Sequence, residues 1–569
     1  MLESSLVATR TELVAERGIV AGGHPDAAAA GVRMLEQGGN AVDALVAAAF
    51  AAFVVEPASC GVGGYGRLAL YLAEPDELVT VDHYVRAPAA ARADLFELDP
   101  DEPLLYYGWP RTRGGANEHG HLAAAVPGAV AGLCSAHDLF GRLPLAQVLE
   151  PAIEAAEHGV PVTWELALAI SSRLAEIQAM PGAAELLLRG GRPPRPADVV
   201  TEGDRLDLSE LAGTLRLIAR KGAAGFHSGP VAEAIEREVA ANGGILTAAD
   251  LAAYRPKLLR ERPASYRGYR YVTANDQVGY EALNILERLD LRRHDPESAE
   301  HRHLIAEALG HAFADNMAYY GDPECTRSPV NGLASREFAA ERAAGIRPDR
   351  AAPRPIVPGD PWPYESADAA PEPVPAAPSA GGVRGTSQVA AADRDGNVAA
   401  LITSLSYGFG SLVLVPGTGV FLNNAMINFD PRPGFPNSLA PGKMPIFAVP
   451  SLVAVGERGD VFAVCGSGGY RIASGVIHTF VHAVDHGLAI QEAVDVPRVH
   501  CQGDETFVDS RIPEAVRERL AQLGHRVVVQ EEAPGQTFFG RVVAIRRDAR
   551  TGLLHAGSGP AWSTAAAGL

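Results

Sequence analysis

Cysteine is scarce in this sequence, and its few copies are widely separated. The 569 residues include Cys60, Cys134, Cys325, Cys465 and Cys501, and no two of them form a C-x-x-C pair. A disulfide framework needs a denser set of cysteines, and a structural zinc site commonly needs paired ones. We therefore expect neither feature in this protein.

Basic residues and long apolar runs are also under-represented. Lys and Arg total 49 against 68 Asp and Glu, which gives a formal net charge of −19. Such a surface repels nucleic acid and anionic membranes, so neither is an expected partner. Charges interrupt the first 18 residues, unlike a signal peptide, and no later segment has an uninterrupted apolar run long enough to span a membrane. We expect a cytoplasmic protein.

Apolar residues make up 47% of the chain, enough for a large core. Residues 25–55 have a helical pattern that Gly38 and Gly39 interrupt, and Asn40 is placed to cap the second helix. The following run "GVGGYG", residues 61–66, formally matches G-x-G-x-x-G. A helix precedes it and a strand follows, which is the reverse of a nucleotide-binding motif. We interpret these glycines as a tight passage from helix to strand.

The middle of the chain, from about 122 to 330, is predicted to be mainly amphipathic helix. Within it, His303, Glu307 and His311 recur every four residues on one helical face. A metal site would need a further ligand and an open cavity. We favour a structural role for these residues and expect no metal and no cofactor.

The composition changes abruptly at residue 346. Residues 346–385 are rich in Pro, Ala, Gly and acidic residues and cannot form a core, so we predict a mobile linker. From residue 386 the pattern favours strands. The first two are predicted to be joined by a turn at Asp395-Gly396.

Thr386 is predicted to begin a buried strand, directly after Gly385 and the linker. If the peptide bond between these two residues breaks, Thr386 acquires a free α-amino group beside its own hydroxyl. An α-amine titrates near neutral pH and can act as the base for that hydroxyl. One residue then supplies both nucleophile and base, so we predict self-cleavage between Gly385 and Thr386.

Six blocks follow one another along the chain: "EQGGNAVDALVAAAF", "GVGGYG", "AFADNMAYYGDPE", "TSQVAAADRDGN", "APGKMPIFAVPSLV" and "CGSGGYRIASGV". In this order they resemble the γ-glutamyltransferase family of N-terminal-nucleophile hydrolases. The resemblance implies an α+β fold, a four-layer αββα sandwich with a largely helical lobe in the N-terminal chain. It also implies a large-subunit portion, 1–345, and a small-subunit portion, 386–569. The two would remain together as a heterodimer, with further dimerisation left open.

The resemblance also implies catalytic roles for particular residues. The family's nucleophile falls on Thr386 rather than on Ser387. Its oxyanion-hole pair falls on Gly468 and Gly469, and its supporting hydroxyl on Ser404. Backbone N–H groups aimed at a developing oxyanion are among the largest contributions to acyl-transfer catalysis.

The positions that hold a γ-glutamyl group in the family are different here. The carboxylate-binding arginine is replaced by Tyr84, and two consecutive serines are replaced by Phe447 and Ala448. The ammonium-binding asparagine, glutamate and aspartate are replaced, respectively, by Ser406, Ala425 and Asn428. Each lost hydrogen bond to a charged group costs about 1.5–3 kcal/mol, so we expect poor γ-glutamyl binding. Arg86 is either a partner for a carboxylate or keto oxygen of the substrate, or a surface charge.

Several functions remain open from the sequence. The first is an autoprocessing amidohydrolase or acyltransferase that takes a small-molecule substrate with a non-glutamyl acyl group, either oxo- or dicarboxylic or apolar. The second is a C–C bond hydrolase of secondary metabolism, similar to homologues in alkylproline antibiotic pathways that release an oxalyl-type fragment. Ordinary γ-glutamyl hydrolysis or transpeptidation is a third. A catalytically retired binding protein is the fourth, and the intact Thr386, Gly468 and Gly469 argue against it.

Overall fold

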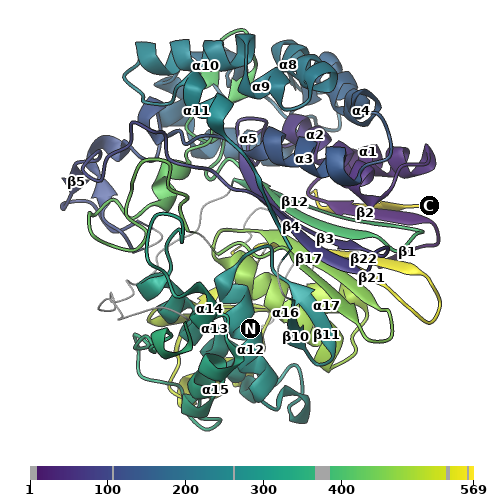
Figure 1. Cartoon of the computed structure of the whole chain (residues 1–569), viewed down its shortest axis with the longest axis vertical. Helices are drawn as coiled ribbons and strands as arrows, with labels where there is room; N and C mark the ends of the chain where they lie inside the picture. The colour runs from purple at the N-terminus through teal and green to yellow at the C-terminus, as the bar shows by residue number, and fades with distance from the viewer. Residues whose placement is uncertain are drawn as a thin grey trace.

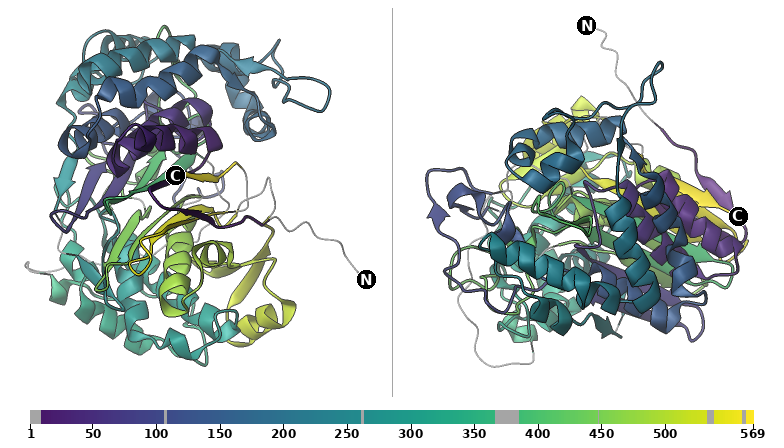
Figure 2. Two further views of the ribbon diagram at one scale, coloured as in Figure 1. Left: turned by 90° about the vertical axis from the view of Figure 1, so that its right-hand side faces the viewer. Right: turned by 90° about the horizontal axis from the view of Figure 1, so that it is seen from above.

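Two stacked seven-stranded sheets form the centre of the computed structural model, and helices cover the outer face of each (Figure 1). Turning the molecule keeps the two helical layers on opposite sides of the paired sheets (Figure 2). The structure describes residues 9–105, 108–260, 263–365, 385–446, 448–532, 538–559 and 563–569. This arrangement confirms the predicted four-layer αββα sandwich.

The first sheet contains the strand that begins at Thr386. Its order is β23, β2, β12, β13, β3, β4 and β9, and all neighbours are antiparallel. In that order the strands span Ala565–Gly568, Gly18–Gly22, Thr386–Asp393, Val398–Ser404, Tyr65–Leu72, Glu77–His83 and Lys257–Leu259. A turn with Gly396 at φ 92° joins β12 to β13, as the Asp395-Gly396 pair predicts.

The second sheet is also antiparallel throughout, in the order β1, β22, β21, β17, β16, β11 and β10. Its strands span Leu13–Ala15, Leu554–Ser558, Arg541–Arg547, Val461–Ser467, Leu452–Gly456, Tyr269–Val272 and Ala264–Tyr266. A smaller sheet contains β18 (Val499–Cys501), β19 (Glu505–Asp509) and β20 (Arg526–Gln530). Short two-stranded pairs are β5 (Leu98–Asp99) with β6 (Arg111–Thr112), β7 (Val160–Pro161) with β8 (Arg205–Leu206), and β14 (Leu414–Val415) with β15 (Val420–Phe421).

Strand β12 shows why the sheets stack. Every residue of β12 is buried, so the strand has no solvent face. Val389 and Ala391 belong to the apolar cluster shared with α1 (Pro25–Glu36) and α2 (Ala41–Val55). Their neighbours Ala390 and Ala392 belong to the cluster shared with the second sheet. Because side chains alternate along a strand, a continuous apolar run fits a strand covered on both faces.

The predicted helical segment from about 122 to 330 is divided between the two outer layers. Its first part packs with α1 and α2: α3 (Ala129–Phe140), α4 (Leu145–His158), α5 (Trp164–Ser172), α6 (Leu174–Gln178), α7 (Pro181–Leu187), α8 (Ser209–Lys221), α9 (Ala224–His227), α10 (Pro230–Ala241) and α11 (Ala248–Ala253). The second layer contains α12 (Gln277–Arg288), α13 (Ala299–Tyr319), α14 (Val330–Leu333), α15 (Arg336–Gly345), α16 (Arg471–Asp485) and α17 (Ile490–Asp495). Helix α18 (Glu514–Gln522) packs beside the small sheet. The described helices of the first layer therefore all precede Gly385, whereas the second layer combines helices from both sides of it.

The break between the first two helices lies where the sequence predicts it. Helix α1 ends at Glu36 and α2 begins at Ala41. The side chain of Asn40 accepts hydrogen bonds from the backbone N–H groups of Val42 and Asp43. These bonds satisfy two helix donors that have no partner within the helix.

Residues 346–365, which the composition assigns to a mobile linker, pack against α13 instead. Arg354 pairs with the carboxylate of Glu307 at 2.5 Å. The backbone N–H of Gly359 donates to a second carboxylate of the same helix at 2.6 Å. Composition does not reveal these partners, because they come from another part of the chain. The remainder of the predicted linker, residues 366–384, lies outside the described residues.

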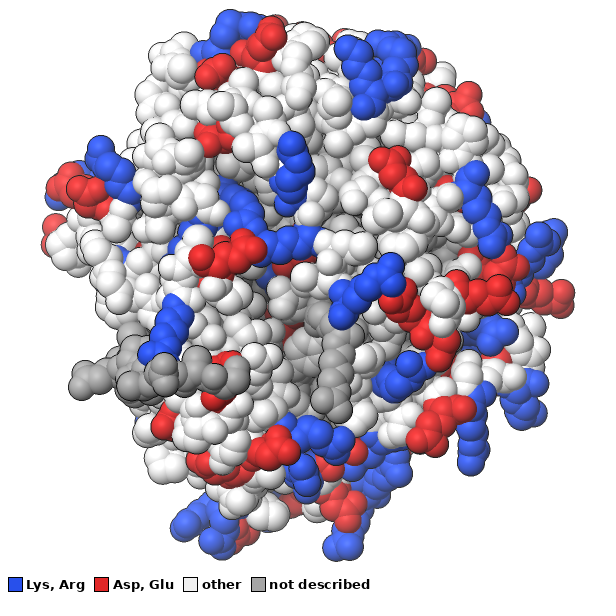
Figure 3. Space-filling model, viewed as in Figure 1, with Lys and Arg blue, Asp and Glu red and all other residues white. Residues whose placement is uncertain are grey.

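Charged side chains of both signs are interspersed over the face shown in Figure 3. On the described residues drawn there, blue and red side chains alternate and do not gather into areas of one sign. Mixed charges of this kind keep a surface hydrated without creating a strong field of one sign. None of the described helices combines the length and the apolar content that crossing a bilayer requires.

Candidate active site

Thr386, the first residue of β12, lies directly opposite Ser404, the last residue of β13. The two hydroxyl oxygens are 2.9 Å apart. Ser404 Oγ is also 2.7 Å from the carbonyl oxygen of Gly385. A carbonyl can only accept, so Ser404 donates to it and accepts from Thr386. The hairpin register thus joins two hydroxyls and the preceding carbonyl in one chain of hydrogen bonds.

The Gly385 carbonyl oxygen has a second donor. The backbone N–H of Leu405 lies 3.1 Å from it, so two donors polarise this carbonyl as an oxyanion hole does. A Cβ at Gly385 would lie 2.2 Å from the carbonyl oxygen of Ser406 and 2.5 Å from the carbonyl carbon of Tyr407. Only glycine fits this position without moving the backbone.

Ser387, the neighbouring hydroxyl residue, has a different partner. Its Oγ donates to Glu56, which follows α2, at 2.8 Å. Side chains alternate along a strand, so adjacent residues of β12 face opposite sides of the sheet. Of the two hydroxyls, only that of Thr386 is joined to Ser404.

Arg541, the first residue of β21, connects the two sheets beside this junction, and the sequence analysis missed it. Its Nη2 donates to the carbonyl oxygen of Thr386 at 2.7 Å, and its Nε donates to Ser467 Oγ at 2.9 Å. Nη1 is 3.8 Å from the carboxylate of Glu56. A single arginine at a strand end carries no signal of such a role in the sequence.

Gly468 and Gly469 follow β17 and precede α16. Their φ angles are 138° and 64°, which favour glycine. A Cβ at Gly468 would also meet the backbone of Gly540 at 2.7 Å. The first N–H groups of a helix lack intrahelical partners and attract negative charge. The turn directly follows Ser467, which shares Arg541 with Thr386.

Three of the predicted acyl-pocket residues come together with a fourth that was not predicted. Asn428 Nδ2 donates to the hydroxyl of Tyr65 at 3.1 Å and has longer contacts of 3.4 Å to Tyr84 and Ser406. Tyr65 and Ser406 are themselves 2.7 Å apart. Burial raises the pKa of Tyr84 well above its usual range, so its hydroxyl stays neutral. The Ser406 backbone N–H donates to Ser404 at 2.9 Å, which connects this cluster to the junction.

The glycine-rich run places Tyr65 in the cluster. At Gly63, Gly64 and Gly66, a Cβ would lie 2.2, 2.4 and 2.3 Å from a backbone oxygen of a neighbouring segment. Side chains at these positions would push the backbone away, and Tyr65 with it. The run forms the passage from α2 to β3, as the sequence interpretation proposed. A lone tyrosine among glycines was the available signal for Tyr65.

The remaining predicted pocket positions are apolar or lie outside the described residues. Ala425 and Ala448 are 0% and 3% exposed and belong to the apolar cluster that includes Tyr84. Phe447 lies outside the described residues. The described part of the pocket therefore combines neutral hydrogen-bonding groups with small apolar side chains.

The structure does not bring Arg86 into this cluster. Its guanidinium is paired with Glu324 at 2.9 Å. A different arginine, Arg67 of β3, lies with its guanidinium 4.6 Å from the ring centre of Tyr84 and is 1% exposed. Asp82 is 3.7 Å away, and among the described residues the three Arg67 nitrogens have no hydrogen-bond acceptor. This buried cation beside Tyr84 is one that the sequence analysis did not consider.

Comparison with known proteins identifies the family of the chain. Residues 27–569 match the family described as Gamma-glutamyltranspeptidase. The Acylase ACY 1 proenzyme of Pseudomonas sp. (strain SE83) is 38% identical over 525 residues, 91% of this chain and 88% of the acylase. The Glutathione hydrolase proenzyme of Bacillus subtilis (strain 168) is 32% identical over 520 residues, 90% of this chain and 86% of that protein. The crystal structure of cephalosporin acylase from Bacillus halodurans has a TM-score of 0.84 and 30% identity, covering 100% of this chain and 98% of that one. The chain therefore belongs to the gamma-glutamyltranspeptidase family.

Proposed function

We propose that this chain is a precursor that cleaves itself between Gly385 and Thr386 and then acts as an acyl hydrolase or acyltransferase. The observation that carries the proposal is the hydrogen-bond chain from Thr386 through Ser404 to the Gly385 carbonyl. Two relatives named as proenzymes support processing into two chains that remain together as a heterodimer.

The cleavage chemistry follows from the same contacts. Thr386 Oγ1 attacks the carbonyl carbon of Gly385, and its proton passes to the neighbouring Ser404 hydroxyl. Negative charge develops on the Gly385 oxygen, where Ser404 and the N–H of Leu405 donate. Ser404 passes a proton on to the amide nitrogen, the C–N bond breaks to give the amine of Thr386, and an ester links Gly385 to the Thr386 oxygen. Water then hydrolyses the ester, which leaves a carboxylate on Gly385 and a free amine on Thr386.

In the mature protein, the freed α-amine of Thr386 is the base for its own hydroxyl, because such amines titrate near pH 8. The hydroxyl attacks the acyl carbonyl of the substrate and forms an acyl-enzyme. The backbone N–H groups of Gly468 and Gly469 stabilise the oxyanion. Water or an amine acceptor then takes the acyl group, and the Thr386 hydroxyl is restored.

We infer that the acyl group lacks an α-ammonium. Ser406 and Asn428 offer neutral partners, and Ala425 is apolar, so these three positions supply no carboxylate for an ammonium. Arg86 is already paired with Glu324, which argues against a role in binding the acyl group. Relatives named acylases support an amide of a non-glutamyl acid, although glutathione hydrolases are also relatives.

Denaturing electrophoresis with N-terminal sequencing tests the cleavage. Incubated wild-type protein should give two fragments, residues 1–385 and 386–569, that coelute under native conditions. Thr386→Ala should stay full-length, and Ser387→Ala should be cleaved at the same bond. A wild-type chain that remains intact after prolonged incubation would contradict the proposal.

A substrate panel tests the acyl group. Mature protein should hydrolyse glutaryl, oxamate-like or apolar acyl amides faster than a γ-glutamyl anilide. Efficient γ-glutamyl turnover would return the protein to ordinary γ-glutamyl chemistry. If no amide is cleaved although Thr386 carries a free amine, C–C bond hydrolysis becomes the leading function.

A further inference from the structure

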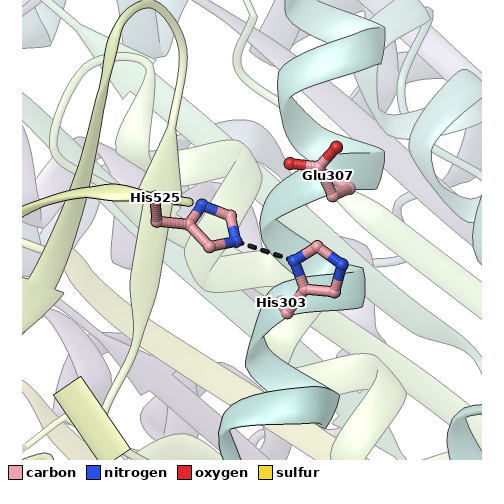
Figure 4. Close-up of side chains that lie close together, drawn as sticks. All are labelled: His303, Glu307 and His525. Carbon is pink, nitrogen blue, oxygen red and sulfur yellow. Dashed lines mark hydrogen bonds between the residues drawn. The ribbon is translucent and has the colours of Figure 1, made fainter. Parts of the chain in front are cut away.

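A buried group of metal-ligating side chains lies on α13, outside the site described above. His303 and Glu307 are one helical turn apart on α13, and His525 lies directly before β20 (Figure 4). All three are buried, and one ligand atom from each lies within 4.8 Å of the others. The sequence pattern offered His311 as the third residue, but the structure brings His525 to that place instead.

Hydrogen bonds fix how His303 faces this group. Its Nε2 is 2.8 Å from the carbonyl oxygen of Arg347, which can only accept. Nε2 therefore carries the proton, and Nδ1 presents a lone pair. That lone pair points at His525 Nε2, 2.7 Å away, as the dashed line in Figure 4 marks.

His525 can carry its ring proton on either nitrogen. Its Nδ1 is 2.9 Å from the hydroxyl of Thr506, which can donate or accept. In one tautomer, His525 Nε2–H donates to His303. In the other, His525 donates to Thr506, and both rings direct a lone pair at one point beside Glu307. Histidines that ligate zinc typically donate their second N–H to a carbonyl or another oxygen, as both rings do in this second state.

The distances between the three candidate ligand atoms are close to those of a zinc site. Zinc bonds of about 2.0–2.1 Å place tetrahedral ligand atoms roughly 3.3 Å apart. The two histidine nitrogens would separate slightly from 2.7 Å, and the Glu307 oxygen would approach. Glu307 is oriented by the backbone N–H of Ala352 at 3.0 Å and by Arg354. Two imidazoles and one carboxylate favour zinc over magnesium or calcium.

The group also lies across the two halves of the chain. His303 and Glu307 precede Gly385, whereas His525 follows it. The surrounding apolar cluster is small and joins the same halves: Ala299, Ala306, Val499, Cys501, Val508, Ile512 and Leu520. Strand pairing in both sheets already joins the two halves, and this small cluster adds little apolar area at its own end of the molecule.

We propose that His303, Glu307 and His525 bind one zinc ion, which cross-links the two fragments of the processed protein. As the ion enters, the ring proton of His525 moves from Nε2 to Nδ1, where it is donated to Thr506, so both rings bind the ion as neutral imidazoles. Metal binding itself is independent of the proposed cleavage, whereas the cross-linking role rests on it.

Metal titration of the whole chain tests the site. Wild-type protein stripped with a chelator should take up one Zn²⁺ per chain by elemental analysis, and Co²⁺ should give visible d–d absorption. His525→Gln and Glu307→Gln should lose this uptake while keeping the wild-type near-ultraviolet circular dichroism. His311→Gln is the matched control, one turn further along the same helix, and should bind like wild type. Equal uptake by wild type and a folded His525→Gln variant would overturn the site.

The uncleaved Thr386→Ala chain separates metal binding from processing. It should bind Zn²⁺ as wild type does, because none of the three ligands changes. In cleaved wild type, Zn²⁺ should raise the denaturant concentration at which the fragments separate, and His525→Gln should abolish that increase. Zinc binding without any such increase would overturn the cross-linking role.

Discussion

The proposed cleavage junction and the proposed acyl pocket draw on different parts of the chain. The junction uses residues of one hairpin, where Thr386 pairs directly with Ser404 and Gly385 immediately precedes. The cluster instead joins both halves of the chain: Tyr65 and Tyr84, at the paired ends of β3 and β4, contact Asn428 from the C-terminal half. In a hairpin, the register of the two strands decides which side chains meet. In a pocket lined by distant segments, each lining residue can be replaced separately. The junction is therefore set by one strand register, whereas the cluster depends on how the two halves of the chain pack together.

The strongest test of the junction is Gly385→Ala. The added Cβ would lie 2.2 Å from the Ser406 carbonyl oxygen, so the scissile carbonyl must move away from Ser404. We expect cleavage to be abolished, measured by denaturing electrophoresis over several days. Gly213→Ala, at an exposed position of α8 with no atom near the added Cβ and no positive φ, should be cleaved normally. Normal cleavage of Gly385→Ala would show that the junction tolerates a shifted carbonyl.

Ser404→Ala tests the hydroxyl that serves both sides of the junction. It removes the acceptor for Thr386 and one of two donors to the Gly385 oxygen, so cleavage should slow by about a hundredfold. Thr403→Ala is the control, because Thr403 donates to the Tyr65 carbonyl instead. Ser404→Thr should restore much of the rate. An unchanged rate in Ser404→Ala would assign the proton transfer elsewhere.

Low pH tests the scaffold apart from the two regions. Neither the junction nor the pocket cluster contains a histidine, so a histidine-dependent loss of stability must come from elsewhere in the fold. Burial lowers the pKa of His482, in α16, from 6.5 to about 4. Below pH 6.5 the unfolded chain binds a proton that the folded chain does not. The free energy of unfolding therefore keeps its full value above pH 6.5 and decreases as the pH falls toward 4. This ring accounts for about 3 kcal/mol of that decrease at most. The charged or titratable groups around it are His301, His478, His486 and Arg302.

Urea unfolding at pH 7 and pH 4.5 measures this loss. His482→Phe should show a smaller difference between the two pH values than wild type. The exposed His158→Gln should behave as wild type. An unchanged difference in a folded His482→Phe protein would assign the acid sensitivity to other groups.

Tyr65→Phe is the mildest change and tests the pocket alone. It removes the hydroxyl that joins Ser406 and Asn428, a loss of about 1 kcal/mol or roughly fivefold in kcat/KM. Self-cleavage should proceed as in wild type. Tyr71→Phe, on the same strand but bonded to Asp76, should leave the kinetics unchanged. If Tyr65→Phe slowed cleavage as well, the two regions would not be separable.

The sequence by itself determined the structural features that depend on residues close together along the chain. The break at Gly38 and Gly39, the Asn40 cap and the turn at Asp395-Gly396 all follow from local backbone preferences. The resemblance implied a supporting role for Ser404, and the register of one hairpin places it opposite Thr386. The four-layer sandwich followed from a resemblance carried by ordered blocks, because similar sequences fold alike.

Only the tertiary structure decided which distant residues meet. Arg541 beside Thr386, and Arg67 beneath Tyr84, come from strands far from the motif that suggested the chemistry. The same holds for His525, which takes the place that the helical pattern gave to His311. Helical and strand periodicities describe the faces of one element, whereas these contacts depend on how separate elements pack against one another.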